Sequence, residues 1–215
     1  MNTPRPIRVL LVGATGAVGS KVLAAALANL RIAQVIAPTR RPLPANARLQ
    51  NPVVDFAHLP AKASWWQADA VICTLGTTIK LAGSQAAFAF VDRDLPIQVA
   101  RLAHANGASC YALNSSLGAS LSGNFYLRTK AQAEAGIRAV GYRSYTIVRP
   151  SLIDAERQQQ RRAEALALAA AHVFRPLIPR RYRPVQAERI AHALLEAVLT
   201  ARSGEHVLES EQLQD

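Results

Sequence analysis

The chain has 215 residues, of which 50% are hydrophobic and 18% are charged, and its formal net charge is +11. That length and composition exclude both a disulfide-stapled mini-protein and a disordered chain. We expect one domain over residues 1–215, in which 151–204 contribute a small cap on the substrate side.

The cysteines and the apolar runs bear on the cellular compartment. Cys73 and Cys110 both lie within apolar runs, which favours buried thiols in a reducing compartment over a disulfide. The apolar run at 9–12 is too short for a signal peptide, and the run at 165–174 is about half of the roughly 20 residues that span a bilayer. We therefore expect a cytoplasmic protein without a membrane segment.

Arginines carry most of the positive charge. No acidic residue precedes Asp55, and a second basic cluster runs over 157–183. Because the chain has no zinc-finger spacing and no aromatic ribonucleoprotein motif, we interpret the arginines as a solvated surface and expect no specific nucleic-acid binding. His104, His192 and His206 have no second ligand at metal spacing, so we expect structural histidines and no metal site.

Short apolar runs alternate with amphipathic stretches in the first 150 residues. The run at 7–12 ends at glycine, which is typical of a strand buried on both faces, and the stretch at 17–30 has helical apolar spacing. Further strands are predicted at 34–37, 69–75, 109–113 and 144–148, and further helices at 84–106 and 124–140. Pro96 predicts a kink or a break near Asp94.

The pattern changes after Pro150, where two helices at 156–174 and 186–201 and a strand at 206–208 are predicted. Strands that alternate with helices pair in parallel. The predicted fold class is therefore α/β, a Rossmann-like doubly wound parallel sheet with helices on both faces and a small C-terminal cap.

Three glycines, Gly13, Gly16 and Gly19, lie where the first strand turns into the first helix. Missing side chains at such a turn allow backbone contact with a pyrophosphate, and a helix N-terminus offers unpaired N–H groups to phosphate. The spacing alone also fits a plain structural turn. Its place between a buried strand and an amphipathic helix predicts dinucleotide binding.

The residues after the second strand, Thr39-Arg40-Arg41, bear on the choice of dinucleotide. An acidic residue here would hold the ribose hydroxyls of NAD, whereas a basic residue would accept the 2′-phosphate of NADP. No carboxylate occurs within the first 54 residues, and guanidiniums bind phosphate bidentately. We predict that NADPH is preferred over NADH; two solvated arginines are the alternative.

Tyr126 and Lys130 are four residues apart, so a helix places both on one face. A phenol is a poor proton carrier at neutral pH, and a nearby ammonium lowers its pKa toward the working range. Ser115 and Ser116 end the preceding strand, where a hydroxyl can polarise a carbonyl. Alone, the pair would fit a surface helix; with the glycine loop upstream, it predicts a catalytic site.

These residues together resemble the short-chain dehydrogenase/reductase superfamily. Longer stretches are similar to its atypical, Tat-interactive-protein-like branch of NAD(P)-binding oxidoreductases: Val53-Val-Asp-Phe56, Cys73-Thr-Leu-Gly-Thr-Thr78, Val91-Asp-Arg-Asp94, Asn114-Ser-Ser-Leu-Gly118 and Val148-Arg-Pro150. The similarity extends from about residue 7 to about residue 206.

The resemblance implies an NADP-binding sheet with a defined set of site residues. Those implied to hold the pyrophosphate and the 2′-phosphate are Gly13, Thr15, Gly16, Ala17, Val18, Arg40 and Arg41. Those implied to line the adenine, the end of the fourth strand and the nicotinamide are Asp55, Phe56, Leu75, Gly76, Thr77, Pro150, Leu152 and Ile153. Tyr126 would transfer the proton, Lys130 would hold the nicotinamide ribose, and Ser116 or Ser115 would bind the substrate carbonyl.

Two functions are consistent with these features. The leading hypothesis is an NADP-dependent oxidoreductase that moves hydride between the nicotinamide and a carbonyl or alcohol carbon of a small molecule. The alternative is an NADPH-sensing protein that signals to a protein partner with little turnover, because fold alone does not separate the two. The complete Ser/Tyr/Lys set favours the enzyme, whereas the small cap, which matches the family least well, and the basic segment 157–183 favour the sensor.

Overall fold

The structure is a computed structural model that describes residues 5–154 and 179–214. The predicted helix at 156–174 lies outside the described residues, as do most of the basic cluster at 157–183 and residues 155–178 of the predicted cap at 151–204. Among the described residues, no helix is both long enough and apolar enough to cross a membrane.

The main sheet has seven strands, all parallel, in the order β3-β2-β1-β4-β5-β6-β9. Their bounds are β1 Ile7–Val12, β2 Ile32–Ile36, β3 Leu49–Gln50, β4 Ala70–Cys73, β5 Cys110–Asn114, β6 Ser144–Arg149 and β9 Gly204–Glu209. Two further short strands, β7 (Ile153–Asp154) and β8 (Val185–Gln186), pair in parallel with each other.

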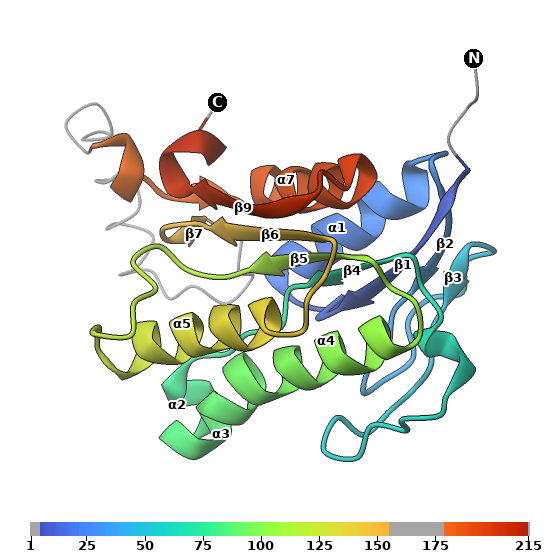
Figure 1. Cartoon of the computed structure of the whole chain (residues 1–215), viewed down its shortest axis with the longest axis horizontal. Coiled ribbons are helices and arrows are strands. Elements are labelled where there is room, and N and C mark those ends of the chain that lie inside the picture. Colours follow the sequence, from blue (N-terminus) through green and yellow to red (C-terminus); the bar gives the residue numbers. More distant parts are fainter. Residues whose placement is uncertain (1–4, 155–178, 215) are drawn as a thin grey trace.

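Helices cover both faces of the sheet (Figure 1). On one face lie α1 (Ala17–Ala28) and α7 (Ala187–Thr200). On the other face lie α2 (Ile79–Ala82), α3 (Gln85–Ala89), α4 (Leu95–Ala105) and α5 (Phe125–Arg138). The remaining described elements are a π-helical segment at Phe90–Asp94 and three short 3-10 turns at Ser64–Trp66, Arg180–Tyr182 and Ser210–Leu213. The predicted class, a Rossmann-like α/β fold with a parallel sheet, is confirmed.

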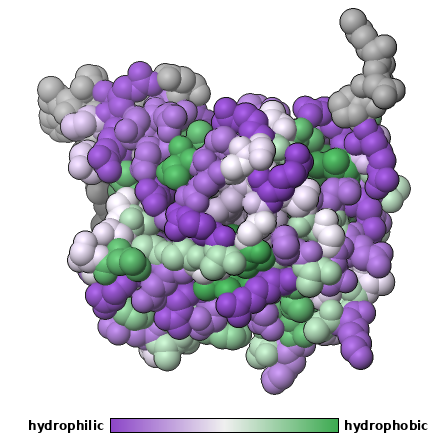
Figure 2. All heavy atoms as spheres, viewed as in Figure 1, coloured by the Kyte–Doolittle hydropathy of each residue, from purple (hydrophilic) through white to green (hydrophobic). Residues whose placement is uncertain are grey.

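The alternation of side chains along the strands divides the core in two. In β1, Val9 and Leu11 pack toward α1 and α7, whereas Leu10 and Val12 pack toward α4 and α5. Both cysteines are buried as predicted, one in each half of the core. Burial raises the pKa of each thiol. The face of the molecule drawn in Figure 2 is mainly hydrophilic, with hydrophobic side chains scattered across the middle of the view.

Where a kink or a break was predicted near Asp94, the chain stays helical but changes to a π-helical turn. The structure has a π-helix over Phe90–Asp94 between α3 and α4, with Pro96 in the first turn of α4. Other boundaries differ slightly from the prediction: α1 ends at Ala28, β2 begins at Ile32, and the two-residue β3 carries no strand signal of its own.

The strand order reverses between β1 and β4. From β1 the chain builds outward through β2 and β3, and then crosses to the other side of β1 to begin β4. At such a switch point, the loops that follow two neighbouring strands run to opposite faces of the sheet. Open α/β sheets bind ligands in the crevice between these loops, outside the carboxyl ends of the strands.

Candidate cofactor and catalytic site

The glycine loop lies at this switch point, between β1 and α1. Gly13 has a φ of +88°, and a Cβ there would lie 2.7 Å from Thr74, the residue after β4. A Cβ at Gly19 would lie 2.0 Å from the carbonyl oxygen of Gly13. These two glycines therefore let β1, α1 and β4 approach one another closely.

The loop leaves the N-terminus of α1 open. Thr15, Gly16 and Ala17 are exposed, whereas Val18 is buried. Gly16 is the N-cap residue and has no side chain with which to cap the helix. The first backbone N–H groups of α1 thus have no side-chain acceptor at the N-cap, which suits a pyrophosphate.

Arg40 and Arg41 follow β2 in a loop that is held from within. The Thr39 hydroxyl donates to the Arg41 carbonyl at 2.6 Å, and the Asn51 amide donates to Thr39 Oγ1 at 2.8 Å and to the Ala37 carbonyl at 2.6 Å. Both guanidiniums are exposed, and neither forms an ion pair with any residue in 5–154 or 179–214. Their charge is available to an anionic ligand.

Asp55 and Phe56 lie beyond this loop. Asp55 is exposed and pairs with His58 at 2.8 Å, and the hydrogen bond from His58 holds the pKa of the Asp55 carboxyl below its usual value. The Phe56 ring is half-buried against the apolar core on the α4 side.

The segment after β4 is anchored at two points. The Thr74 hydroxyl donates to the Val12 carbonyl at 3.0 Å, which joins the segment to β1. The Thr77 N–H donates to Asp92 Oδ2 at 2.9 Å. Between these anchors, Leu75 is half-buried and Gly76 is exposed.

Tyr126 and Lys130 share one face of α5, but their surroundings differ. Tyr126 is half-buried, with its ring centroid 5.5 Å from that of Phe88. The Lys130 side chain is 8% exposed, and its Nζ lies 2.7 Å from Asp92 Oδ1. Burial lowers the pKa of Lys130, but Asp92, with a smaller contribution from Tyr126, outweighs it and raises that pKa above its usual value.

The two serines after β5 are not equivalent. Ser115 is buried, and its hydroxyl donates to Glu134 Oε1 at 2.5 Å. Glu134 in turn pairs with Arg149 at 2.6 Å, and Arg149 reaches Glu209 at 3.0 Å. Ser116 is half-buried, and its hydroxyl makes no hydrogen bond to another described residue. The geometry therefore favours Ser116 over Ser115 as a group that can reach a substrate.

The chain after β6 completes the predicted set. The Pro150 carbonyl accepts from the Leu117 N–H at 2.8 Å, which joins the β5 and β6 ends. Leu152 and Ile153 are 74% and 41% exposed. The structure thus brings the glycine loop, the segment after β4, the serines, α5 and the chain after β6 to one edge of the sheet.

Sequence reasoning missed Asp92, Glu134 and Arg149, which hold Lys130 and Ser115. Asp92 lies within a stretch that carries the family resemblance. Its contact with Lys130 spans 38 positions of sequence, so no local spacing predicts it.

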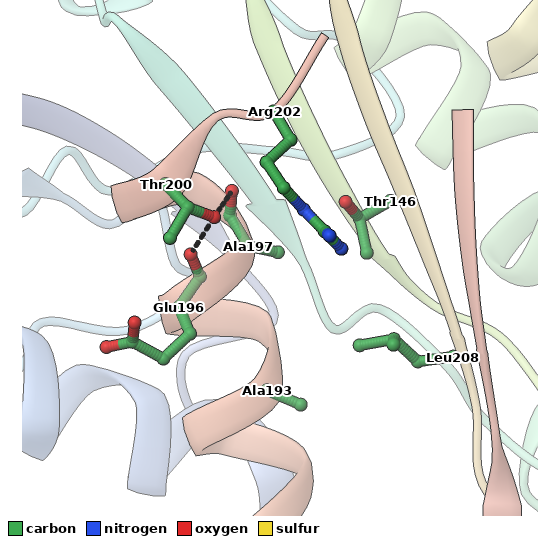
Figure 3. A pocket seen from close by; sticks show the side chains of 7 residues that line it. All are labelled: Thr146, Ala193, Glu196, Ala197, Thr200, Arg202 and Leu208. Atoms are coloured by element: carbon green, nitrogen blue, oxygen red, sulfur yellow. Dashed lines mark hydrogen bonds between the residues drawn. The ribbon is translucent and has the colours of Figure 1, made fainter. Parts of the chain in front are cut away.

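A cavity of about 340 Å³ lies elsewhere, between α7 and the strands β6 and β9. It is lined by Thr146, Ala193, Glu196, Ala197, Thr200, Arg202 and Leu208. Figure 3 shows the Arg202 side chain extending toward Thr146, while the Glu196 carboxylate points away. None of the lining residues belongs to the predicted cofactor or catalytic set.

Comparison with other sequences identifies a family and relatives. Residues 13–200 match the family model described as NAD(P)H-binding. The mitochondrial protein fmp52 of Emericella nidulans is 34% identical over 170 residues, which cover 74% of this chain and 72% of the relative. Protein HTATIP2 of Rattus norvegicus is 34% identical over 165 residues, which cover 74% of this chain and 68% of the relative.

Solved structures share the fold. MoeE5 in complex with UDP-glucuronic acid and NAD has a TM-score of 0.72 at 17% identity, covering 94% of this chain and 76% of its own. UDP-glucuronic acid 4-epimerase from Bacillus cereus, in complex with UDP-glucuronic acid and NAD, has a TM-score of 0.71 at 14% identity, covering 94% and 77%. At these identities the likeness concerns the fold alone.

The expectation of a cytoplasmic protein is wrong. It is overturned by the fungal fmp52 relatives, which are named as mitochondrial proteins. The expectation rested on two thiols in apolar runs, and buried thiols of this kind occur in any reducing compartment.

Proposed function

Because the chain belongs to the NAD(P)H-binding family, within the atypical short-chain dehydrogenase/reductase group of HTATIP2 and fmp52, we propose that it is an NADP-dependent oxidoreductase acting on a small carbonyl or alcohol. The observation that carries the proposal is the pairing of a half-buried Tyr126 with a buried, charged Lys130 at the same sheet edge as the open N-terminus of α1.

The residues of this edge divide into binding and chemical roles. The N-terminus of α1 would hold the pyrophosphate, and Arg40 and Arg41 would bind the 2′-phosphate. NADPH, when held by these residues, would supply hydride chemistry at this edge. Tyr126 would donate the proton to the carbonyl oxygen, while Ser116 donates a hydrogen bond to the same oxygen. Lys130 would bind the nicotinamide ribose and keep a positive charge beside the phenol.

Apolar side chains support a substrate with an apolar body. Leu121 lies between β5 and α5 and is 63% exposed, and Leu152 after β6 is 74% exposed. Because adjacent parallel strands end at the same edge of a sheet, both side chains belong to the edge that carries Tyr126. Exposed apolar side chains at a site of this kind favour burial of apolar ligand surface.

The proposal is tested by turnover of the purified protein with NADPH and a panel of aldehydes, ketones and quinones, followed by the loss of nicotinamide absorbance. Tyr126→Phe should lower turnover by about 10²–10⁴-fold with little change in NADPH affinity, because it removes only the transferable proton. Lys130→Ala should lower turnover and affinity together.

Two control variants separate chemistry from folding. Tyr142→Phe removes a buried hydroxyl that donates to the Ala100 carbonyl, and Lys62→Ala removes an exposed ammonium; neither should change turnover. An established activity that survives Tyr126→Phe would refute the proton-donor role. NADPH binding without turnover on any carbonyl would favour the sensor instead.

A further inference from the structure

Asp92 joins three parts of the candidate site through one carboxylate. It is 2% exposed and lies in the π-helical segment Phe90–Asp94. Its Oδ1 lies 2.7 Å from Lys130 Nζ on α5, and its Oδ2 accepts the Thr77 N–H at 2.9 Å from the segment after β4. The two oxygens thus face different elements: Oδ1 forms the ion pair with the ammonium, and Oδ2 accepts the backbone hydrogen bond.

Asp92 lies on the buried face of this helical stretch, four residues after the buried Phe88 and three before the buried Leu95. A π turn shifts the side chains relative to an α-helix and is frequent at functional sites. The neighbouring Arg93 and Asp94 stay near the surface, where they pair with each other at 2.7 Å and are 35% and 46% exposed. Asp92 is therefore the acid of this segment that the backbone turns into the molecule.

A buried ion pair at this place calls for an explanation other than stability. Desolvating two charges costs several kcal/mol per ion, so buried pairs often stabilise a fold no better than apolar residues would. Perturbed ionisable groups that converge in a cleft are instead typical of functional sites. A Cβ added at Gly76 would lie 3.5 Å from Asp92 Oδ1 and 3.7 Å from Lys130 Nζ, so the loop backbone passes directly over the pair.

Three titratable groups face the Lys130 ammonium. They are Asp92 from the π-helical segment, Tyr126 from α5 itself and Cys73 from β4. Burial lowers the pKa of Lys130, and the Asp92 carboxylate is the main influence that raises it. Without that carboxylate, the buried amine would shift toward its neutral form.

We propose that Asp92 is a positioning residue for the reaction, which holds Lys130 as an ammonium beside Tyr126 and ties it to the loop at 75–77. This inference rests on the proposed function for its catalytic consequence. A neutral amine at this position would give the phenol no positive neighbour. A displaced ammonium would lose its place at the nicotinamide ribose.

The direct test is the titration of Lys130 in protein labelled with ¹³C-lysine. The chain has four lysines, and the other three have exposed or half-exposed side chains, so the buried one is readily distinguished. In Asp92→Asn, Lys130 should titrate about one pH unit or more below wild type, because burial remains and the opposite charge is lost. In the matched control Asp94→Asn it should titrate as in wild type. An unchanged Lys130 in Asp92→Asn would overturn the proposal.

The kinetic test uses the pH profile of kcat/KM. In Asp92→Asn the alkaline limb of the profile should move to lower pH together with the Lys130 titration. In Asp92→Glu, which keeps the negative charge, this shift should be smaller. If kcat/KM of Asp92→Asn falls by the same factor at every pH, the role of Asp92 is merely structural and the proposal is overturned. Absence of turnover in wild type would refute the proposed function, and the Lys130 titration would still decide whether Asp92 holds the ammonium.

A second measurement covers the case in which Asp92→Asn fails to fold. Asp92→Asn combined with Lys130→Met removes both buried charges, so no unpaired ion remains. If the two groups act as a pair, the double variant should be more stable to urea than either single variant. Stability losses that simply add would overturn the pairing, and with it the proposal.

Discussion

Gly19 and Gly16 belong to one loop but differ in the space that a side chain would have. A Cβ at Gly19 would meet the Gly13 carbonyl oxygen at 2.0 Å, whereas a Cβ at Gly16 would lie 3.3 Å from the same oxygen. At Gly19 the backbone would have to move to make room for the Cβ. At Gly16 a shift of the neighbouring atom by a few tenths of an ångström would be enough.

Gly19→Ala should therefore lower the free energy of unfolding by about 1–3 kcal/mol, the usual cost of overpacking, and should weaken NADPH binding by displacing the loop. Gly16→Ala is the matched control and should leave the melting temperature close to that of wild type. Thermal unfolding of the three proteins checks this, and equal destabilisation by both substitutions would contradict it.

Arg40 and Arg41 lie beside the switch point, and neither pairs with an acidic residue of the described part of the chain. NADPH should bind at least tenfold tighter than NADH, a difference of about 1.4 kcal/mol. Arg40→Ala combined with Arg41→Ala should remove most of that difference while leaving NADH affinity nearly unchanged. Isothermal titration calorimetry measures both affinities, and Arg101→Ala, an exposed arginine on α4, is the control. Equal affinities in wild type would count against the assignment.

At the scale of elements, the end of α7 contains a strained residue. Ala201 is the one non-glycine residue with positive φ in the described chain, at φ 43° and ψ 44°. A left-handed conformation costs an L-residue roughly 1–2 kcal/mol, and glycine avoids most of this cost. The turn before β9 also contains Gly204, with a φ of +92° and no atom within 4 Å of an added Cβ.

Ala201→Gly should raise the free energy of unfolding by about 1 kcal/mol. Gly204→Ala should lower it by a similar amount, because the cost there lies in the backbone alone. Urea denaturation with a constant slope measures both changes. A destabilised Ala201→Gly protein would indicate that the methyl group packs more favourably than the backbone strain costs.

Elements with a strong local pattern could be predicted from the sequence. The apolar run at 7–12 ends at Gly13, and the helix that follows repeats its apolar residues every three or four positions, so β1 and α1 could be placed closely. Pro96 marked the interrupted helix because a proline is disfavoured within a helix. The two-residue β3 lacks such a signal, since it is defined by its pairing with β2 rather than by its own residues.

In the candidate site, too, only the residues that follow a local pattern could be predicted from the sequence. Tyr126 and Lys130 share a local helical spacing, and the glycine loop has a fixed position after a strand. The partners of these groups are not local: Asp92 reaches Lys130, and Glu134 reaches Ser115 and Arg149, only once the strands have paired. Contacts of that kind depend on the tertiary fold, which periodicity does not describe.

At the scale of the whole molecule, an ion pair connects the edge strand β9 to the helix α5. Arg138 at the end of α5 donates to both carboxylate oxygens of Glu205 on β9, at 2.5 and 2.6 Å. This hydrogen bonding holds the pKa of Glu205 below its usual value. The pair is partly exposed, with 49% and 34% of the two side chains accessible, so its contribution is modest.

Glu205→Gln should cost about 0.5 kcal/mol of unfolding free energy at pH 7. Because the folded-state pKa of Glu205 is lowered, the pair stabilises the fold above the unfolded-state pKa and loses this effect as the pH falls through the folded-state value. The difference between wild type and Glu205→Gln should therefore vanish in acid. Urea melts at several pH values test this, and a difference that persists in acid would assign the stabilisation to packing.

The packing of α7 on α1 has a consequence for how the protein opens. Within the described sheet, strands β1, β2 and β3 pair with the other four strands only through β1 and β4. The helices α1 and α7 connect the two parts of the sheet: they pack against each other, and Lys21 of α1 pairs with Glu188 of α7 at 2.7 Å. Neither part can detach without uncovering the apolar face of the other. Amide hydrogens in α1 and α7 should therefore exchange with solvent through one shared opening, as a single cooperative unit.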